Sequence, residues 1–427
     1  MSAFAYRGGE LFAEDVAVAS LADRFGTPLY VYSRAAIESA FRAFDASFAG
    51  MPHLVCYALK ANSNLAVLDV LARQGAGFDI VSGGELARVL AAGGDPSRVV
   101  FSGVGKRVDE MEAALAAGIL CFNVESPAEL ARLAEVAARA GRRAPVSLRV
   151  NPHVDARTHP YIATGLATSK FGIAHDEALD LYRHAATLPS IAVTGIDCHI
   201  GSQITDLAAL VEAATRVFDL ADRVEAAGIP LAHVDLGGGI GVRYRDEVPI
   251  APADYAAAVR RAVGKRRHTL LFEPGRALVA NAGILVTRVE YLKRGGERRF
   301  AIVDAAMNDL MRPALYDAWH DVRPVHPRDG ATETWEIVGP VCESADSFAK
   351  DRPMPPLAEG DLVAFGVAGA YGAVMSSTYN ARPLPAEIMV RGGDFAVVRE
   401  RPDIDMIIDQ DRLPEWLAPP ALTRGAA

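Results

Sequence analysis

The sequence predicts a (β/α)₈ barrel joined to a second, mostly antiparallel β domain. Three observations predict this fold. Between residues 54 and 273, eight short apolar runs alternate with helical patterns rich in alanine and leucine. Each run ends in polar residues, and beyond about residue 280 β-type runs follow one another with few helices between them. An open doubly wound sheet is the competing fold, but the glycine-rich segment comes late in the chain and is not of the dinucleotide-binding type.

The eight apolar runs are expected to be the barrel strands. Each is followed by a polar turn and an amphipathic helix such as Pro127–Val136. This alternation implies right-handed βαβ units and a parallel sheet, and eight strands close a barrel in about 250 residues. The expected strands are 54–59, 77–81, 98–102, 120–124, 145–150, 192–200, 231–236 and 269–273.

The region after the barrel predicts the second domain. Its β-type runs suggest mostly antiparallel strands, and the early run Leu29–Tyr32 is expected to pair with them. We therefore expect the barrel at 34–278, and a β domain made of 1–33 and 279–427. The later runs are Ile284–Tyr291, Phe300–Val303, Thr334–Val338 and Asp361–Phe365.

The composition is that of an ordinary globular protein and limits the classes of partner. The 427 residues are 51% hydrophobic and 23% charged, with a net charge of -9 and no basic block, which argues against nucleic acid and anionic membranes. No run has the length of a membrane span, so a cytoplasmic location is expected. The four cysteines, at positions 56, 121, 198 and 342, lack metal-ligand spacing, and neither disulfides nor a metal site is expected.

Polar residues end all eight expected strands. The active site of such a barrel lies at the carboxyl ends of its strands, so these side chains should meet at one mouth. A single polar residue at a strand end is weak evidence for a site. Polar residues at the ends of all eight strands are hard to explain as part of a hydrophobic core. They are Lys60; Asp79 and Ser82; Ser102; Asn123 and Glu125; Arg149 and Asn151; His199 and Ser202; Asp235 and Gly237–Gly239; Glu273 and Arg276.

Lys60 follows the first apolar run, in Tyr57–Asn62. An ammonium at the end of a buried strand needs a partner or a lowered pKa, and such a lysine is a candidate for imine formation with a carbonyl group. Most strand-end lysines simply reach solvent. The rest of the chain must therefore supply a cofactor.

Two glycine-containing motifs supply a phosphate site. Asp235–Gly241 follows the seventh strand and Glu273–Arg276 the eighth, where barrels of this kind usually bind phosphate. Tight turns are the alternative reason for such glycines. Phosphate and lysine at one mouth point to pyridoxal phosphate, with Glu273 as the acid for its ring nitrogen. His199 could stack on the ring; the alternative is a hydrogen-bonded core histidine.

Five segments together resemble the diaminopimelate decarboxylase family, pyridoxal phosphate enzymes of the alanine racemase-like fold group. The resemblance runs from Phe25 to Asn380. The lysine and Glu-Pro-Gly-Arg motifs are shared with ornithine and arginine decarboxylases, whereas the cysteine block with its trailing Phe348–Arg352 is more specific to the diaminopimelate branch. The segments are Tyr57–Asn62, His199–Gln203, Gly237–Gly239, Glu273–Arg276 and Gly339–Asp346.

The resemblance implies pyridoxal-phosphate-dependent decarboxylation of meso-2,6-diaminopimelate to L-lysine and CO₂, the last step of lysine biosynthesis by a carboxy-lyase. Lys60 would form the imine and Cys342 would reprotonate the α-carbon. Cys342 and Glu343 would enter the neighbouring subunit's barrel, which requires a homodimer. The implied cofactor contacts are Lys60, His199, Ser202, Gly238, Gly239, Glu273, Gly275, Arg276 and Tyr371. The implied substrate contacts are Arg276, Arg312, Tyr316, Glu343 and Tyr371.

Three rival functions use the same barrel. A decarboxylase of ornithine, arginine or lysine, or a bifunctional one, would need a distal pocket that accepts an ammonium without a carboxylate. An amino-acid racemase would leave the carboxylate in place, and the block at Cys342 and Glu343 argues against it. A non-enzymatic pyridoxal phosphate carrier would not need the extra β domain.

Overall fold

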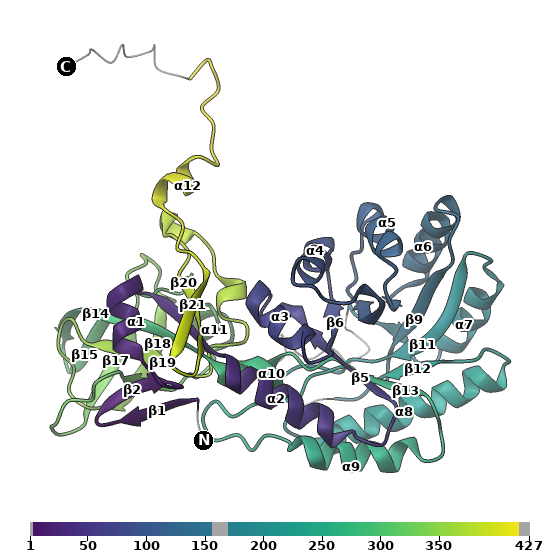
Figure 1. Cartoon of the computed structure of the whole chain (residues 1–427), viewed down its shortest axis with the longest axis horizontal. Coiled ribbons are helices and arrows are strands. Elements are labelled where there is room, and N and C mark those ends of the chain that lie inside the picture. Colours follow the sequence, from purple (N-terminus) through teal and green to yellow (C-terminus); the bar gives the residue numbers. More distant parts are fainter. Residues whose placement is uncertain (1–2, 156–169, 418–427) are drawn as a thin grey trace.

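The computed structural model describes residues 3–155 and 170–417. Two bodies lie side by side in Figure 1: a barrel ringed by helices, and a β-rich domain built from both ends of the chain. The expected combination of a TIM barrel with a mostly antiparallel β domain is confirmed. The predicted boundaries, 34–278 for the barrel and 1–33 with 279–427 for the β domain, stay a prediction, and both chain ends lie outside the described residues.

Eight parallel strands close the barrel. β13 pairs with β5 through Leu270 and His53, and β8 pairs with β9, so the sheet has no open edge at either junction. The short strand β10 (Ile173–Ala174) adds to β9 and was not expected, because two residues carry no periodic signal. The barrel strands are β5 (His53–Ala58), β6 (Gly77–Ile80), β7 (Val99–Phe101), β8 (Cys121–Val124), β9 (Ala144–Asn151), β11 (Ile191–Asp197), β12 (His233–Asp235) and β13 (Thr269–Phe272).

Helices cover the outside of the barrel, as Figure 1 shows. Several begin at a polar residue that accepts a backbone hydrogen bond. Ser82 accepts one from the Glu85 amide and Ser126 one from the Glu129 amide, so these strand-end serines are helix caps. The helices are α2 (Arg34–Ser47), α3 (Leu65–Ala72), α4 (Gly83–Ala91), α5 (Val108–Ala117), α6 (Pro127–Arg139), α7 (Ala178–Thr187), α8 (Leu207–Ala226) and α9 (Pro252–Val263).

Apolar side chains fill the barrel on both sides of its wall. Between the strands and α2 and α9, the rings of Phe48 and Phe272 lie 4.0 Å apart, with Phe44 and Tyr255 around them. Inside, Cys56 and Cys121 pack with Val100 and Leu271. Cys56, Cys121 and Cys198 are buried, as expected of core residues.

The second domain is organised around the long strand β14 (Gly283–Gly295). It pairs antiparallel with β4 (Leu29–Ser33), β15 (Arg298–Val303) and β19 (Leu362–Phe365), so the expected pairing of the early run 29–32 is confirmed. Two pairings, β15 with β17 and β4 with β20, are parallel. The other strands are β16 (Val322–Pro324), β17 (Glu333–Val338), β18 (Ser347–Met354), β20 (Ala386–Arg391) and β21 (Asp394–Arg399).

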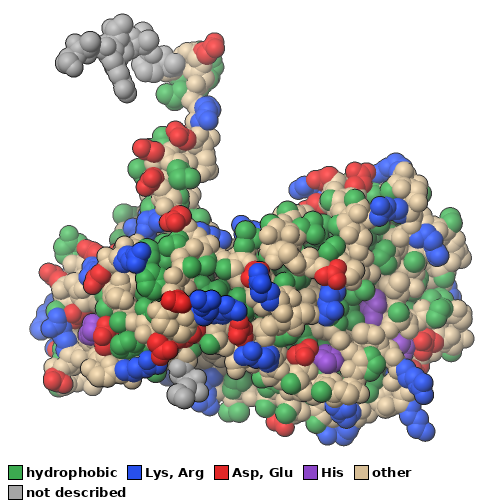
Figure 2. All heavy atoms as spheres, in the orientation of Figure 1, with side chains coloured by type: hydrophobic (Ala, Val, Ile, Leu, Met, Phe, Trp, Pro, Cys, Tyr) green, Lys and Arg blue, Asp and Glu red, His purple; other side chains and the backbone are tan. Residues whose placement is uncertain are grey.

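The chain before β4 contains elements that the sequence did not predict. β1 (Phe4–Arg7), β2 (Glu10–Ala13) and β3 (Val16–Ala17) form a separate small antiparallel sheet, followed by α1 (Val18–Phe25). The strands are too short for a clear alternating pattern. Charged side chains of both signs are interspersed over the face in Figure 2. Across the described ranges, no helix is long and apolar enough to cross a membrane.

Hydrogen bonds join the second domain to the turn that follows β5. The Tyr371 amide donates to the Ala61 carbonyl at 2.7 Å, and the Asn62 side chain donates to the Gly369 carbonyl at 3.1 Å. Asn64 also donates to the buried Glu387 carboxylate at 3.1 Å. The turn that carries Lys60 is therefore held from both domains.

Candidate active site

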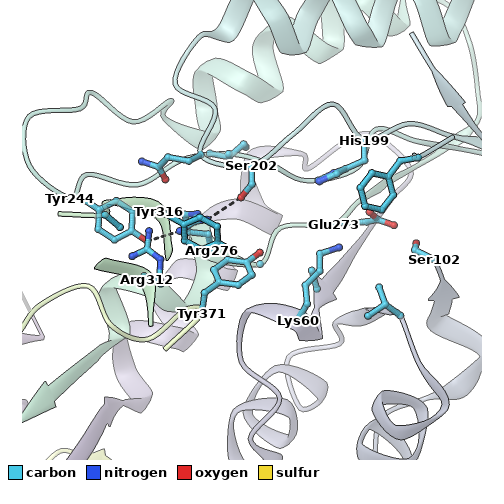
Figure 3. A pocket seen from close by; sticks show the side chains of 18 of the residues that line it. Lys60, Ser102, His199, Ser202, Tyr244, Glu273, Arg276, Arg312, Tyr316 and Tyr371 are labelled. Atoms are coloured by element: carbon cyan, nitrogen blue, oxygen red, sulfur yellow. Dashed lines mark hydrogen bonds between the residues drawn. The ribbon is translucent and has the colours of Figure 1, made fainter. Parts of the chain in front are cut away.

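The carboxyl ends of the barrel strands and the second domain enclose a cavity of about 770 Å³. Figure 3 shows Lys60 and Glu273 on one side of it, and two arginines among three tyrosines on the other. Most of the expected site residues line this cavity. They are Lys60, His199, Ser202, Gly239, Glu273, Gly275, Arg276, Arg312, Tyr316 and Tyr371.

Lys60 lies in the short 3₁₀ turn Leu59–Ala61 after β5. Its Nζ donates to Asp79 Oδ2 at 2.9 Å, because Asp79 sits on β6 directly across from Ala58. Burial by itself would lower the pKa of Lys60, but the charges of Asp79 and Glu273 outweigh it and raise the pKa. The lysine therefore has the expected partner, a carboxylate that orients the amine and stabilises its protonated form.

Glycines let three loops approach one another at one end of the cavity. Gly239 has φ +100°, and a Cβ there would lie 2.3 Å from the Gly201 carbonyl oxygen. A Cβ on Gly275 would lie 3.0 Å from that of Ala61. The site therefore offers bare backbone close to Ser202, which is the lining that a phosphate group requires.

Arg276 and Arg312 give this end a positive charge. Arg276 donates to Tyr244 Oη at 2.6 Å and to Ser202 Oγ at 3.1 Å, while its buried Nε has no hydrogen-bond partner within the described part of the chain. Arg312 lies over the Tyr244 ring, 4.3 Å from its centre. In residues 3–155 and 170–417, neither guanidinium lies within 4.0 Å of a carboxylate. Both charges remain available to anions.

Three buried carboxyl groups lie together at the opposite end, and of these Glu273 lines the cavity. Asp197 ends β11, Asp235 ends β12 and Glu273 follows β13, so adjacent strands bring one oxygen of each within 4.8 Å of the others. Burial and the neighbouring carboxylates raise the pKa of Asp197 and of Glu273 well above their usual range. Glu273 accepts a hydrogen bond from Asn123 Nδ2 at 3.3 Å. The ionised form of Glu273 would be stable in this buried position only beside a positive charge.

Such a cluster could share protons or ligate a cation. The positive charges of Lys60 and Arg149 act on these carboxyl groups and oppose a further cation, which favours proton sharing. A protonated ring nitrogen would supply Glu273 with both an N–H donor and a positive charge. The residues present therefore fit pyridoxal phosphate: an amine, a glycine-lined anion site and an acid for the ring.

His199 has a fixed orientation between these ends. Its Nδ1 accepts a hydrogen bond from the Gly238 amide at 3.2 Å. Burial and the charges of Lys60 and Arg149 lower the pKa of His199 well below its usual value, so the ring is neutral. Gly238 itself does not line the cavity. A Cβ there would lie 2.1 Å from the Glu273 carbonyl oxygen, so this glycine is required for the close approach of two loops.

Cys342 and Glu343 lie away from the cavity. Both are exposed, in the segment between β17 and β18, and neither lines the cavity of its own chain. The described structure therefore does not bring these two expected residues together with Lys60.

Sequence reasoning missed two residues of the arginine-rich end. Tyr244, which contacts both arginines, follows the glycine motif after β12 and had no strand-end position to mark it. His320 contacts Arg312 from eight residues along the chain. The only signal in the sequence was a histidine close to a candidate arginine.

Comparisons with known proteins agree on one family. Residues 34–280 match the family model for the pyridoxal binding domain of pyridoxal-dependent decarboxylases. A diaminopimelate decarboxylase of Pseudomonas aeruginosa is 59% identical over 97% of this chain and 100% of its own length. That of Vibrio cholerae is 57% identical over 93% and 96%.

Solved structures give the same result. The crystal structure of diaminopimelate decarboxylase from Helicobacter pylori complexed with L-lysine has a TM-score of 0.89 at 43% identity, over 92% of this chain and 98% of that one. The enzyme from M. jannaschii in co-complex with L-lysine has a TM-score of 0.93 at 35% identity, over 97% and 99%.

The carboxyl cluster predicts a pH-dependent stability effect of Asp197→Asn. The raised pKa means that the folded protein keeps a proton that the unfolded chain releases near pH 4, so stability falls as pH rises above that value. Asparagine has no such proton. Relative to the wild type, the variant should become progressively more stable between pH 5 and pH 8, measured as the free energy of unfolding in urea.

The exposed Asp411 supplies the matched control, and Asp411→Asn should show no such gain. If the difference between Asp197→Asn and the wild type stays constant from pH 5 to pH 8, the carboxyl groups do not share protons as described.

Proposed function

The chain belongs to the pyridoxal-dependent decarboxylases, and we propose that it converts meso-2,6-diaminopimelate to L-lysine and CO₂, the last step of lysine biosynthesis. One observation carries the choice of substrate: Arg276 and Arg312 face the cavity with no carboxylate partner in the described ranges. A phosphate group and a second substrate carboxylate together require two such cations. The names of the relatives and their L-lysine complexes support the same substrate.

The cofactor is pyridoxal phosphate, and the residues that line the cavity divide its binding among them. We assign Lys60 to the aldehyde and Glu273 to the ring nitrogen, with His199 against the ring. When bound, the group supplies an aldehyde that reacts with amines and a ring that accepts an electron pair. The remaining cofactor contacts that we assign are Ser202, Gly239, Gly275, Arg276 and Tyr371, which line the cavity. Gly238, outside the lining, would contribute through the close packing of its loop against Glu273.

The protein's own side chains position the substrate and move its protons. Asp79 orients the Lys60 amine through the 2.9 Å hydrogen bond. Arg276 from the barrel, and Arg312, Tyr316 and Tyr371 from the second domain, bind the substrate's polar groups. Substrate that fills the cavity would displace water from the bond that breaks, and this would strengthen each charged contact.

We propose that a second copy of the chain completes each site. Cys342 would donate a proton to the α-carbon, and Glu343 would bind the distal ammonium, both in the partner's cavity. Exposed apolar side chains at the edge of the cavity support this proposal. Val81 and Val104 line the cavity, and they are 39% and 45% exposed. Covering them would bury apolar surface. A cytoplasmic location stays a prediction from the sequence.

A substrate panel tests the activity. With added pyridoxal phosphate, CO₂ release from meso-2,6-diaminopimelate should exceed that from ornithine, arginine and lysine by at least about 100-fold in kcat/KM, because those substrates leave a buried guanidinium without its carboxylate. Comparable rates would support a broader basic amino-acid decarboxylase instead. Racemisation of alanine without CO₂ release would support a racemase.

Mixing two inactive variants tests the shared site. Lys60→Ala and Cys342→Ala homodimers should each have very low activity. After subunit exchange, about a quarter of wild-type activity should return, because half of the dimers are mixed and each has one intact site. The rate of CO₂ release measures this recovery. Each variant exchanged with itself is the control, and no recovery in the mixture would mean that Cys342 acts within its own chain.

A further inference from the structure

His320 is a buried histidine that contacts a cavity-lining arginine but does not line the cavity itself. It lies between α11 (Arg312–Tyr316) and β16. Its Nε2 is 2.7 Å from Arg312 Nη1, and its Nδ1 is 2.8 Å from the Gly366 carbonyl oxygen. The ring also meets Tyr244 edge to face, 5.4 Å between centres. Arg312 is thereby packed between His320 and the Tyr244 ring.

The two hydrogen bonds determine which ring nitrogen of His320 carries the proton. A carbonyl oxygen only accepts, so Nδ1 must donate to Gly366. A guanidinium only donates, so Nε2 must accept from Arg312. The imidazole is therefore neutral with its proton on Nδ1. Burial and the nearby Arg312 lower the pKa of His320 to about 3, in agreement with that assignment.

The backbone around His320 is also held firmly. Its carbonyl accepts a hydrogen bond from Arg352 Nη1 at 2.7 Å. The Gly366 amide donates to the Asp321 carbonyl at 2.8 Å, at the end of the pairing between β16 and β19. His320 Nε2, the acceptor for Arg312, is therefore held in place by the second domain.

A neutral hydrogen-bond acceptor and a carboxylate would affect the charge of Arg312 differently. A carboxylate would orient Arg312 but would also neutralise it, and would then repel an anionic substrate group. An imidazole nitrogen uses one N–H of the guanidinium and leaves its charge in place. The other donors of Arg312 remain available on the cavity side.

We propose that His320 is a positioning residue that aims Arg312 at the distal carboxylate of the substrate without neutralising it. This inference rests on the proposed function and specifies how its substrate is recognised. The distal carboxylate is the one that L-lysine retains. His320 should therefore favour ligands that carry this carboxylate over otherwise similar diamines.

The test compares two ligands of the pyridoxal phosphate-loaded enzyme by calorimetric titration. L-Lysine has the carboxylate, and 1,5-diaminopentane lacks it. His320→Phe keeps the ring and removes both nitrogens. The Kd for L-lysine should rise about 10- to 100-fold, while the Kd for 1,5-diaminopentane should change by less than about twofold. Cofactor absorbance should stay as in the wild type, because His320 does not contact the cofactor.

Two further variants separate orientation from charge. His320→Gln restores an acceptor and should bind L-lysine within about fivefold of the wild type. His320→Glu would still orient Arg312 but would neutralise its charge. It should raise the Kd for L-lysine at least as much as His320→Phe does. The exposed His326, changed to glutamine, supplies a control that should leave both ligands unaffected.

The outcomes distinguish this inference from the proposed function. If His320→Phe weakens both ligands equally, or if His320→Glu binds L-lysine like the wild type, the inference is wrong. Failure of the proposed function would appear in the wild type itself, as no binding of L-lysine and no CO₂ release from meso-2,6-diaminopimelate.

Discussion

The hydrogen-bonded ion pair of Lys60 and Asp79, at 2.9 Å, is the interaction on which the rest of the site depends. It exists because β5 and β6 are neighbours in register, with Ala58 opposite Asp79. Closure of the barrel then sets β13 on the other side of β5, which brings Glu273 close enough to influence the same lysine. Hydrogen bonds from the second domain fix the turn between them. The Lys60 amine is thus held at a defined place in the cavity.

The cavity separates charge in a way that costs stability in the protein alone. Glu273, with two more buried carboxyl groups behind it, lies at one end. Guanidinium groups that have no carboxylate partner among the described residues lie at the other. Each arrangement is unfavourable unless a ligand of opposite charge binds. Pyridoxal phosphate has both opposite charges: its phosphate can bind the guanidinium groups, and its protonated ring nitrogen can bind a carboxylate. The same reasoning explains why Arg312 is paired with the neutral His320.

Much of the fold could be predicted from the sequence, because alternating strands and helices have only a few ways to pack. Lys60 and Glu273 were found for the same reason: strand ends converge in a closed barrel. The side-chain partners of individual site residues were not predictable. The pairing of Lys60 with Asp79 depends on strand register, and the support of Arg312 by His320 depends on how the second domain folds back. Ser82 was selected by position, but it caps a helix.

The most direct test of the account is to locate the covalent link between cofactor and protein. Borohydride reduction of the loaded enzyme, followed by peptide mass mapping, should place the pyridoxyl group on Lys60 alone. Lys60→Ala should lose both the label and the cofactor absorbance, whereas the exposed Lys265, changed to alanine, should keep them. A label on another lysine, or full activity in Lys60→Ala, would contradict the central claim.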